Sequence, residues 1–157
     1  MSTASRLLFP LSILSGACGE GDLPGNYFDL ELSGAENLCT GGGADHSESH
    51  QYRLVYDGND ITVAIGDSVW ATGTTEGCRV DYTSIAWSSL REGYEIQWQI
   101  VGTARVDAEG GAGCIEDSGV DWQGTETFIV TTSFHPDVPS GCTYTLDATG
   151  RFATKIE

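Results

Sequence analysis

Apolar and polar residues alternate along the second half of this chain, and this period of two restricts the fold more than any other feature. In residues 94–107 the even positions are apolar or small, whereas the odd positions are polar except at Val101. Residues 122–131 and 142–152 repeat the pattern, with even positions again expected to face inward. Successive side chains of a strand point to opposite faces, so each segment is predicted to be a strand with one buried face. One-sided strands of this kind are typical of antiparallel sheets.

Five further strands are predicted upstream, separated mostly by short turn sequences such as Asp57-Gly58-Asn59-Asp60. They are Asn26–Leu32, Gln51–Tyr56, Asp60–Ile65, Ser68–Gly73 and Cys78–Trp87. Three connections are longer: Ser33–His50, Ala108–Asp121 and Ser133–Ser140. A meander of about eight antiparallel strands can close into a barrel, which removes exposed edges, and a two-sheet sandwich is the alternative. The chain is therefore predicted to hold one all-β domain over residues 26–157.

The N-terminal residues have the layout of an export signal. Arg6 precedes the apolar run Leu7–Leu14, and small residues follow as far as Ala17. This run is too short to cross a membrane, which takes roughly 20 apolar residues. We therefore expect residues 1–17 to be a signal peptide and residues 18–25 to form a tether.

The segment Leu14-Ser15-Gly16-Ala17-Cys18 resembles the lipobox of bacterial lipoproteins, although that family usually has Leu where Ser15 stands. The resemblance implies that Cys18 becomes the lipidated first residue and anchors the domain to a bacterial membrane in the cell envelope. Secretion as a soluble extracellular or periplasmic protein is the alternative, because small residues before Cys18 also suit an ordinary signal peptidase.

The five cysteines fit this interpretation. A lipid on Cys18 leaves four, and four cysteines in an oxidising compartment predict two disulfides. In an eight-strand meander, alternating strand directions bring Cys39 to the same end of the barrel as Cys142, and Cys78 to the same end as Cys114. The predicted disulfides are therefore Cys39–Cys142 and Cys78–Cys114.

Charge narrows the range of partners. The formal net charge of −16 argues against nucleic acid, which is bound by basic surfaces, and against charge-driven docking to anionic lipid. The partners we expect are a membrane, through lipid on Cys18, and a small molecule or another envelope protein.

Glu126 is the strongest candidate for a functional side chain. Its even position places a carboxyl group on an inward face, where it must find a partner or change its pKa. It is a candidate ligand-facing or catalytic acid; the alternative is a carboxyl bonded to Tyr or Trp inside the barrel, or one near an open mouth. Trp98 and Trp122 lie on inward faces too and are further ligand-facing candidates, with core filling as the alternative.

Two groups of residues have side chains that commonly bind metals, and neither leads us to expect a metal or another cofactor. His46 and His50 have a spacing that zinc sites use on helices, but their neighbours indicate a loop without a third ligand. The acidic residues of the connection before residue 122 could suit calcium, but surface charge accounts for them equally well. They are Asp107, Glu109, Glu116, Asp117 and Asp121. His135, which precedes Pro136, is expected at the surface.

Two short motifs are similar to those of lipocalin-type barrels: Gly25-Asn26-Tyr27 at the first strand and Val80-Asp81-Tyr82 further along. Tyr27 stands where that family has Trp, and Val80 where it has Thr. The resemblance implies a carrier of a small apolar ligand. Because no nucleophile or phosphate-binding motif is present, we expect a non-enzymatic binding or scaffolding domain of the cell envelope. The carrier and a hydrolase that uses an inward carboxylate are the alternatives.

Overall fold

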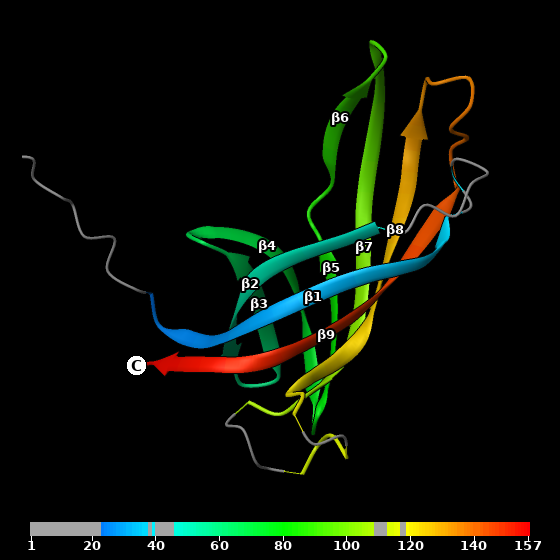
Figure 1. Ribbon diagram of the computed structural model, residues 1–157. Coiled ribbons are helices and arrows are strands. Elements are labelled where there is room, and N and C mark those ends of the chain that lie inside the picture. Colours follow the sequence, from blue (N-terminus) through cyan, green and yellow to red (C-terminus); the bar gives the residue numbers. More distant parts are fainter. Residues whose placement is uncertain (1–22, 38, 40–45, 109–112, 117–118) are drawn as a thin grey trace, which may run out of the picture.

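The structure, a computed structural model, describes residues 23–37, 39, 46–108, 113–116 and 119–157. This part of the chain forms nine β-strands and no helix (Figure 1). The strands are β1 (Gly25–Asn37), β2 (His46–Asp57), β3 (Asp60–Ile65), β4 (Ser68–Glu76), β5 (Arg79–Ser84), β6 (Trp87–Arg91), β7 (Tyr94–Val106), β8 (Trp122–Ser133) and β9 (Thr143–Ile156).

Eight of the strands close into an antiparallel barrel. The order around the ring is β5-β4-β3-β2-β1-β9-β8-β7, and β5 pairs with β7 to complete it. The first and last strands are hydrogen-bonded neighbours over most of their length. The predicted all-β meander is confirmed, and the closed ring rules out the two-sheet sandwich.

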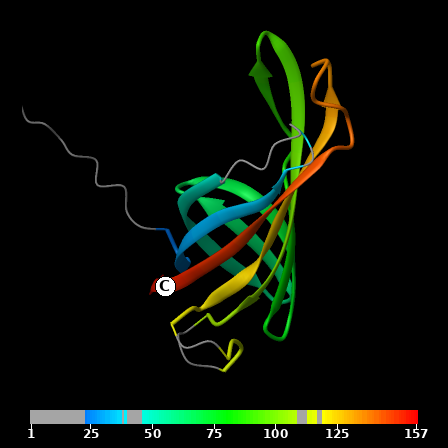
Figure 2. The ribbon, with the colours of Figure 1, turned by 45° about the vertical axis from the view of Figure 1, so that its right-hand side comes forward.

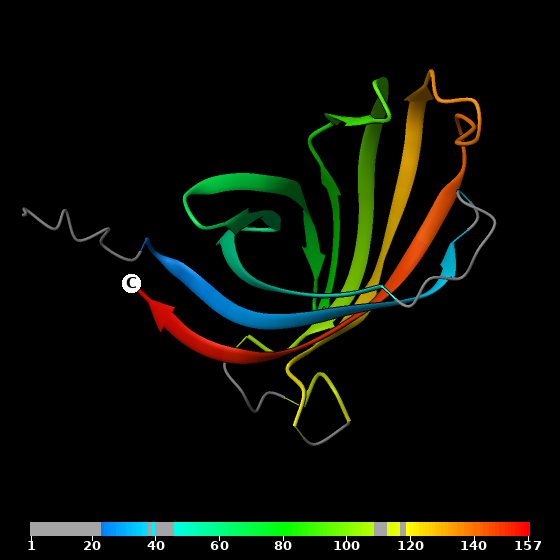
Figure 3. The same ribbon diagram turned by 45° about the horizontal axis from the view of Figure 1, so that its top comes forward.

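The strand directions give the barrel two distinct ends. At the lower end of the barrel, β1 begins at Gly25 and β9 finishes at Ile156. At the upper end, β2, β4 and β9 begin. In Figure 3 the upper ends of β7 and β8 rise away from the ring.

The predicted strand Cys78–Trp87 is wrong in part. The segment divides into β5 and β6, and β6 continues to Arg91 before a turn at Glu92 and Gly93. Both pieces pair with β7, but Arg79 lies opposite Arg105 whereas Trp87 lies opposite Trp98. The register therefore changes by one residue between them, which is a bulge that breaks the strand.

Strand β6 lies outside the ring and belongs to an extension of the barrel wall. We define the extension as β6, residues 94–98 of β7 and residues 130–133 of β8, which stand above the ring in Figure 2. A small second core supports it, formed by Cys39, Ile96, Val130 and Val138. The extension therefore has packing of its own beside the upper end.

The lower half of the barrel interior is filled by side chains. Even positions of β7, β8 and β9 face inward, as predicted, and the glycines among them make room for large neighbours. The fully or almost fully buried residues here include Phe28, Leu54, Ile61, Val80, Val106 and Trp122. Trp122 is in edge contact with Phe28 at a centroid distance of 5.4 Å.

The two disulfides lie at opposite ends of the barrel. Cys39–Cys142 joins the connection after β1 to the start of β9 at the upper end, with Cα atoms 5.1 Å apart. Cys78–Cys114 joins two lower-end connections, with Cα atoms 5.5 Å apart. These are the pairs that the strand directions predict, and they indicate an oxidising environment outside the cytoplasm.

Residues 1–22, with the predicted signal peptide and Cys18, lie outside the described part of the chain. Among the described residues, no helix has the length and apolar character needed to cross a membrane.

Candidate functional site

Glu126 is fully buried at mid-height in the barrel, facing inward as its position in β8 predicts. Its Oε1 accepts two hydrogen bonds, one from the Tyr52 hydroxyl at 2.9 Å and one from the Tyr82 hydroxyl at 2.7 Å. Two phenols from different strands thus hold one oxygen of a buried carboxyl group.

Gly102 leaves the space through which the Tyr82 side chain reaches Glu126. Within the ring, Gly102 of β7 lies between Tyr82 on β5 and Glu126 on β8. A Cβ atom at Gly102 would overlap the ring of Tyr82. The phenol therefore passes over the bare backbone of β7 to reach a carboxyl group two strands away.

Burial controls the protonation of this cluster. It raises the pKa of Glu126, while the hydrogen bonds from Tyr82 and Tyr52 act in the opposite direction. Burial likewise raises the pKa of Tyr82 and of Tyr52 well above their usual range, and the Glu126 carboxylate adds to both effects. The phenols therefore stay protonated and act as donors to Glu126.

A polar path leads from Glu126 toward the upper end. The ring of Tyr52 stacks with His50 at a centroid distance of 6.2 Å, and His50 Nε2 lies 3.3 Å from Glu48 Oε2. About a third of each side chain of the latter pair is exposed. Glu48 also raises the pKa of Glu126, so the two carboxyl groups interact electrostatically.

Five aromatic side chains continue the lining of the upper end, and we call them the aromatic arc. In order of contact they are Trp70, Trp87, Phe128, Tyr144 and Trp98. Successive ring centroids are 5.1, 6.4, 4.4 and 5.8 Å apart. The residues come from β4, β6, β8, β9 and β7, and all except Phe128 are partly exposed.

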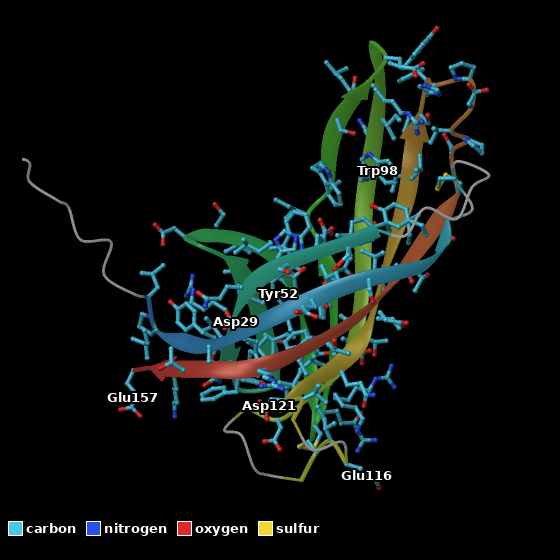
Figure 4. All side chains as sticks on the ribbon, in the orientation of Figure 1. Asp29, Tyr52, Trp98, Glu116, Asp121 and Glu157 are labelled. Carbon is cyan, nitrogen blue, oxygen red and sulfur yellow. A yellow bond between two sulfur atoms is a disulfide. The ribbon has the colours of Figure 1, made fainter. Side chains whose placement is uncertain are left out.

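The structure separates the two tryptophans that sequence reasoning grouped together. Trp98 belongs to the aromatic arc, and its Nε1 donates to Ser89 Oγ at 2.9 Å. Trp122 is completely buried among Phe28, Tyr52 and Tyr82. Figure 4 labels Tyr52 within the ring and Trp98 higher on β7.

Three buried polar atoms of the interior make no hydrogen bond within the described residues: Glu126 Oε2, Trp70 Nε1 and Trp122 Nε1. The Trp70 indole still acts on Tyr52, since its N–H opposes the rise in the pKa of that phenol. Unsatisfied buried polar groups are rare in native proteins, and each one needs an explanation, a bound water, ion or other group among them.

The metal candidates do not come together. Asp107 Oδ2 accepts from the Gly113 amide and Asp121 Oδ2 from the Phe152 amide, so both serve the local backbone. Glu116 is exposed, at the lower end with Asp121 in Figure 4, and Glu109 and Asp117 lie outside the described residues, as does the His46 side chain. No group of three metal-ligating side chains occurs in the described ranges.

The expectation of a surface His135 is wrong. The residue is 6% exposed beneath the extension, where its ring contacts Tyr94 in an edge arrangement and its Nδ1 accepts from the Asp137 amide. The connection after β8 folds back on the sheet, as shown by the Gly141 amide bonded to the Val130 carbonyl at 2.7 Å.

A groove of about 710 Å³ runs along the outside of the barrel, and His50, whose ring stacks with Tyr52, is one of its lining residues. Asp29, Glu31, Gln51 and Arg151 line it, and Gln51 donates to Asp29 at 2.8 Å. Most of its lining side chains are polar and belong to the outer face of the barrel.

Comparisons with protein-family models, with curated proteins and with solved structures give no match. The residues alone therefore define the class. This is an eight-stranded up-and-down barrel with a packed lower half, a buried acid held by two phenols, and an upper end lined by aromatic rings.

Proposed function

We propose that this protein is an exported, lipid-anchored, non-enzymatic binding domain of the cell envelope that takes a small molecule at the upper end of its barrel. The observation that carries the proposal is the aromatic arc, partly exposed, above a buried carboxyl group with one oxygen left without a hydrogen bond.

The division of the interior supports the choice of the upper end. Side chains such as Trp122 and Leu54 fill the lower half and are fully buried, so a ligand would have to displace the core to reach the interior there. Two cavities of about 510 and 440 Å³ at this end are lined by residues of its rim, Tyr56 and Ala108 among them. The rings of Trp87, Trp98 and Tyr144 keep exposed surface beside the polar pair His50 and Glu48. Ligand sites commonly combine apolar walls with a few polar groups in this way.

The position of the tether supports an anchored domain. Four of the five cysteines form disulfides, and Cys18 remains for a different role. Gly25 begins β1 at the lower end, so an anchor on Cys18 attaches the barrel by that end. The upper end then points away from the membrane, toward solutes of the compartment.

Native mass spectrometry of the full chain, extracted from the membranes of its host in mild detergent, tests both halves of the proposal. We expect a chain that starts at Cys18 and carries a covalent lipid, together with a small molecule that dissociates on activation. Trp87→Leu should lose the small molecule and keep the lipid. Tyr56→Leu, which removes a ring 37% exposed at the lower end, should keep both.

Two results would contradict the proposal separately. A chain without lipid, or one that begins elsewhere, would contradict the anchor. The absence of any dissociable small molecule from wild-type protein, across rich and minimal growth media, would contradict binding at the upper end.

A further inference from the structure

We infer that the ligand of the upper end is an organic cation, an ammonium ion on a small carbon skeleton, held between the aromatic arc and the carboxyl groups of Glu48 and Glu126. The inference rests on the proposed function and adds the chemical class of the ligand.

The aromatic arc supplies the surface that organic cations prefer. Three of its five members are tryptophans, and the face of Trp attracts a cation more strongly than that of Tyr or Phe. Trp70 and Trp87 are tilted at 44°, and Trp98 meets Tyr144 at 77°, so the rings present faces in several directions. A rounded ammonium group can contact several such faces at once, as in aromatic cages.

The charges inside the barrel have the sign that a cation requires. Glu48 and Glu126 both raise the pKa of Tyr144, a member of the aromatic arc, after the larger effect of burial. Both carboxyl groups therefore lie near enough to the arc to act on its electrostatics. Glu48 contacts His50, and about a third of its side chain reaches solvent, so it is the carboxylate that meets an entering ligand first.

Apart from His50, which contacts Glu48, the basic side chains discussed next, arginines and a lysine of the described part of the chain, are directed elsewhere. Arg53 donates to the Pro24 carbonyl, Arg79 pairs with Asp81 at 2.8 Å, and Arg105 donates to the Cys114 carbonyl. Arg91, Arg151 and Lys155 are exposed. No lysine or arginine among them neutralises the carboxyl groups of the interior.

Two further features agree with a cation. Glu126 Oε2 is a buried acceptor without a donor, beneath the polar path from His50 through Tyr52. The formal net charge of −16 gives the whole molecule a negative field, which raises the local concentration of cations and their rate of arrival.

Pairs of probes with the same shape and different charge test the inference. We would titrate the full-length protein with choline and with its uncharged isostere 3,3-dimethyl-1-butanol, following tryptophan fluorescence and calorimetric heat. Phenethylammonium and 2-phenylethanol form a second pair. Each cation should bind at least about tenfold more tightly than its neutral partner, because the aromatic faces attract the positive charge and gain nothing comparable from the uncharged isostere.

Matched charge variants locate the effect. Glu48→Gln should weaken binding of the cations about tenfold and leave the neutral probes unchanged. Glu31→Gln removes the same charge from the outer face of β1 and should change neither. Near-UV circular dichroism checks that both variants keep the native fold.

The outcomes distinguish the inference from the proposed function. Equal affinity for cation and neutral partner, or unaltered cation binding by Glu48→Gln, overturns the cation while binding at the upper end stands. If the probes do not bind and native mass spectrometry retains a neutral or anionic molecule, the cation is again overturned. If the probes do not bind and nothing is retained, the proposed function falls with it.

Discussion

At the scale of single residues, burial of an acid inside the barrel raises the pKa of that acid. Glu126 has no exposed surface, and its partners are neutral phenols rather than a cation. An ionised carboxylate in this position would lose most of its hydration without a compensating positive charge. The net rise in the pKa of Glu126 follows from this balance.

Replacing Glu126 by Gln should therefore change how stability depends on pH. Because the pKa of Glu126 is raised above 4.5 in the folded state, the folded protein holds this proton more tightly than the unfolded chain does. The resulting stabilisation is complete at low pH and is lost as the pH rises through the folded-state pKa. Glu126→Gln stays neutral, so its free energy of unfolding relative to wild type should grow as the pH rises through the folded-state pKa of Glu126.

Urea unfolding at several pH values measures this difference. Glu31→Gln, on the outer face of β1, serves as the control and should follow the wild-type curve. Parallel curves for Glu126→Gln and wild type would mean that Glu126 is ionised in the folded protein.

The sequence predicts the inward direction of Glu126, Trp98 and Trp122, but not their height in the barrel. Direction follows from the period of two, whereas height and neighbours follow from the register between strands distant in sequence. The alternative of a carboxyl group bonded to a Tyr inside the barrel is confirmed, but the identity of the partner could not be predicted, because Tyr52 lies 74 residues before Glu126. For the same reason Trp122 and Trp98, both inward, occupy opposite ends.

At the scale of elements, the contact between β5 and β8 across β7 depends on Gly102, which has no side chain. Gly102→Ala should push the Tyr82 ring away from Glu126, because the new methyl group occupies the space of the phenol. We expect a loss of about 1–3 kcal/mol in the free energy of unfolding, typical of an overpacked core. With one donor gone, the pKa of Glu126 should rise further, so stability should remain pH-dependent over a wider range.

Chemical unfolding and thermal melting both report the loss. Val101→Ala is the matched control on the same strand, because that side chain points outward and is 43% exposed. A Gly102→Ala variant as stable as Val101→Ala would show that Tyr82 has another position available.

The break between β5 and β6 could not be predicted from the alternation of apolar and polar residues. Odd positions of β6 share the inner face with even positions of β7, since Trp87 lies opposite Trp98 and Ser89 opposite Ile96. The bulge at residues 85–86 shifts the inward-facing positions from even numbers in β5 to odd numbers in β6. In the sequence, such a break in the alternation cannot be told from the end of a strand or from a turn. The eight strands of the ring, which keep regular pairing, were predictable; the added strand was not.

At the scale of the whole molecule, two covalent links secure the two ends of the barrel separately. Replacing Cys39 and Cys142 by Ala should cost roughly 2–5 kcal/mol, because the link closes a loop of about 100 residues in the unfolded chain. Cys39 also packs with Ile96, Val130 and Val138, so the extension should lose order before the ring does.

Hydrogen exchange resolves the two effects. Amides of residues 94–98 and 130–133 should exchange faster in the Cys39/Cys142 variant, while those of β3 and β4 keep their protection. The variant without Cys78 and Cys114 is the control and should show the opposite distribution, with faster exchange near the lower end. Uniform loss of protection in both variants would mean that the barrel and the extension unfold as one unit.

The pairing of β1 with β9 determines when the barrel can close during synthesis of the chain. A chain delivered end-first, from a ribosome or through a membrane pore, presents β1 long before the fourteen residues of β9 arrive. Until then the first strand has one edge without its final neighbour, and Cys39 waits for a partner 103 positions later. No segment before β9 can complete the ring, so its closure and its upper covalent link wait until β9 and Cys142 have been delivered.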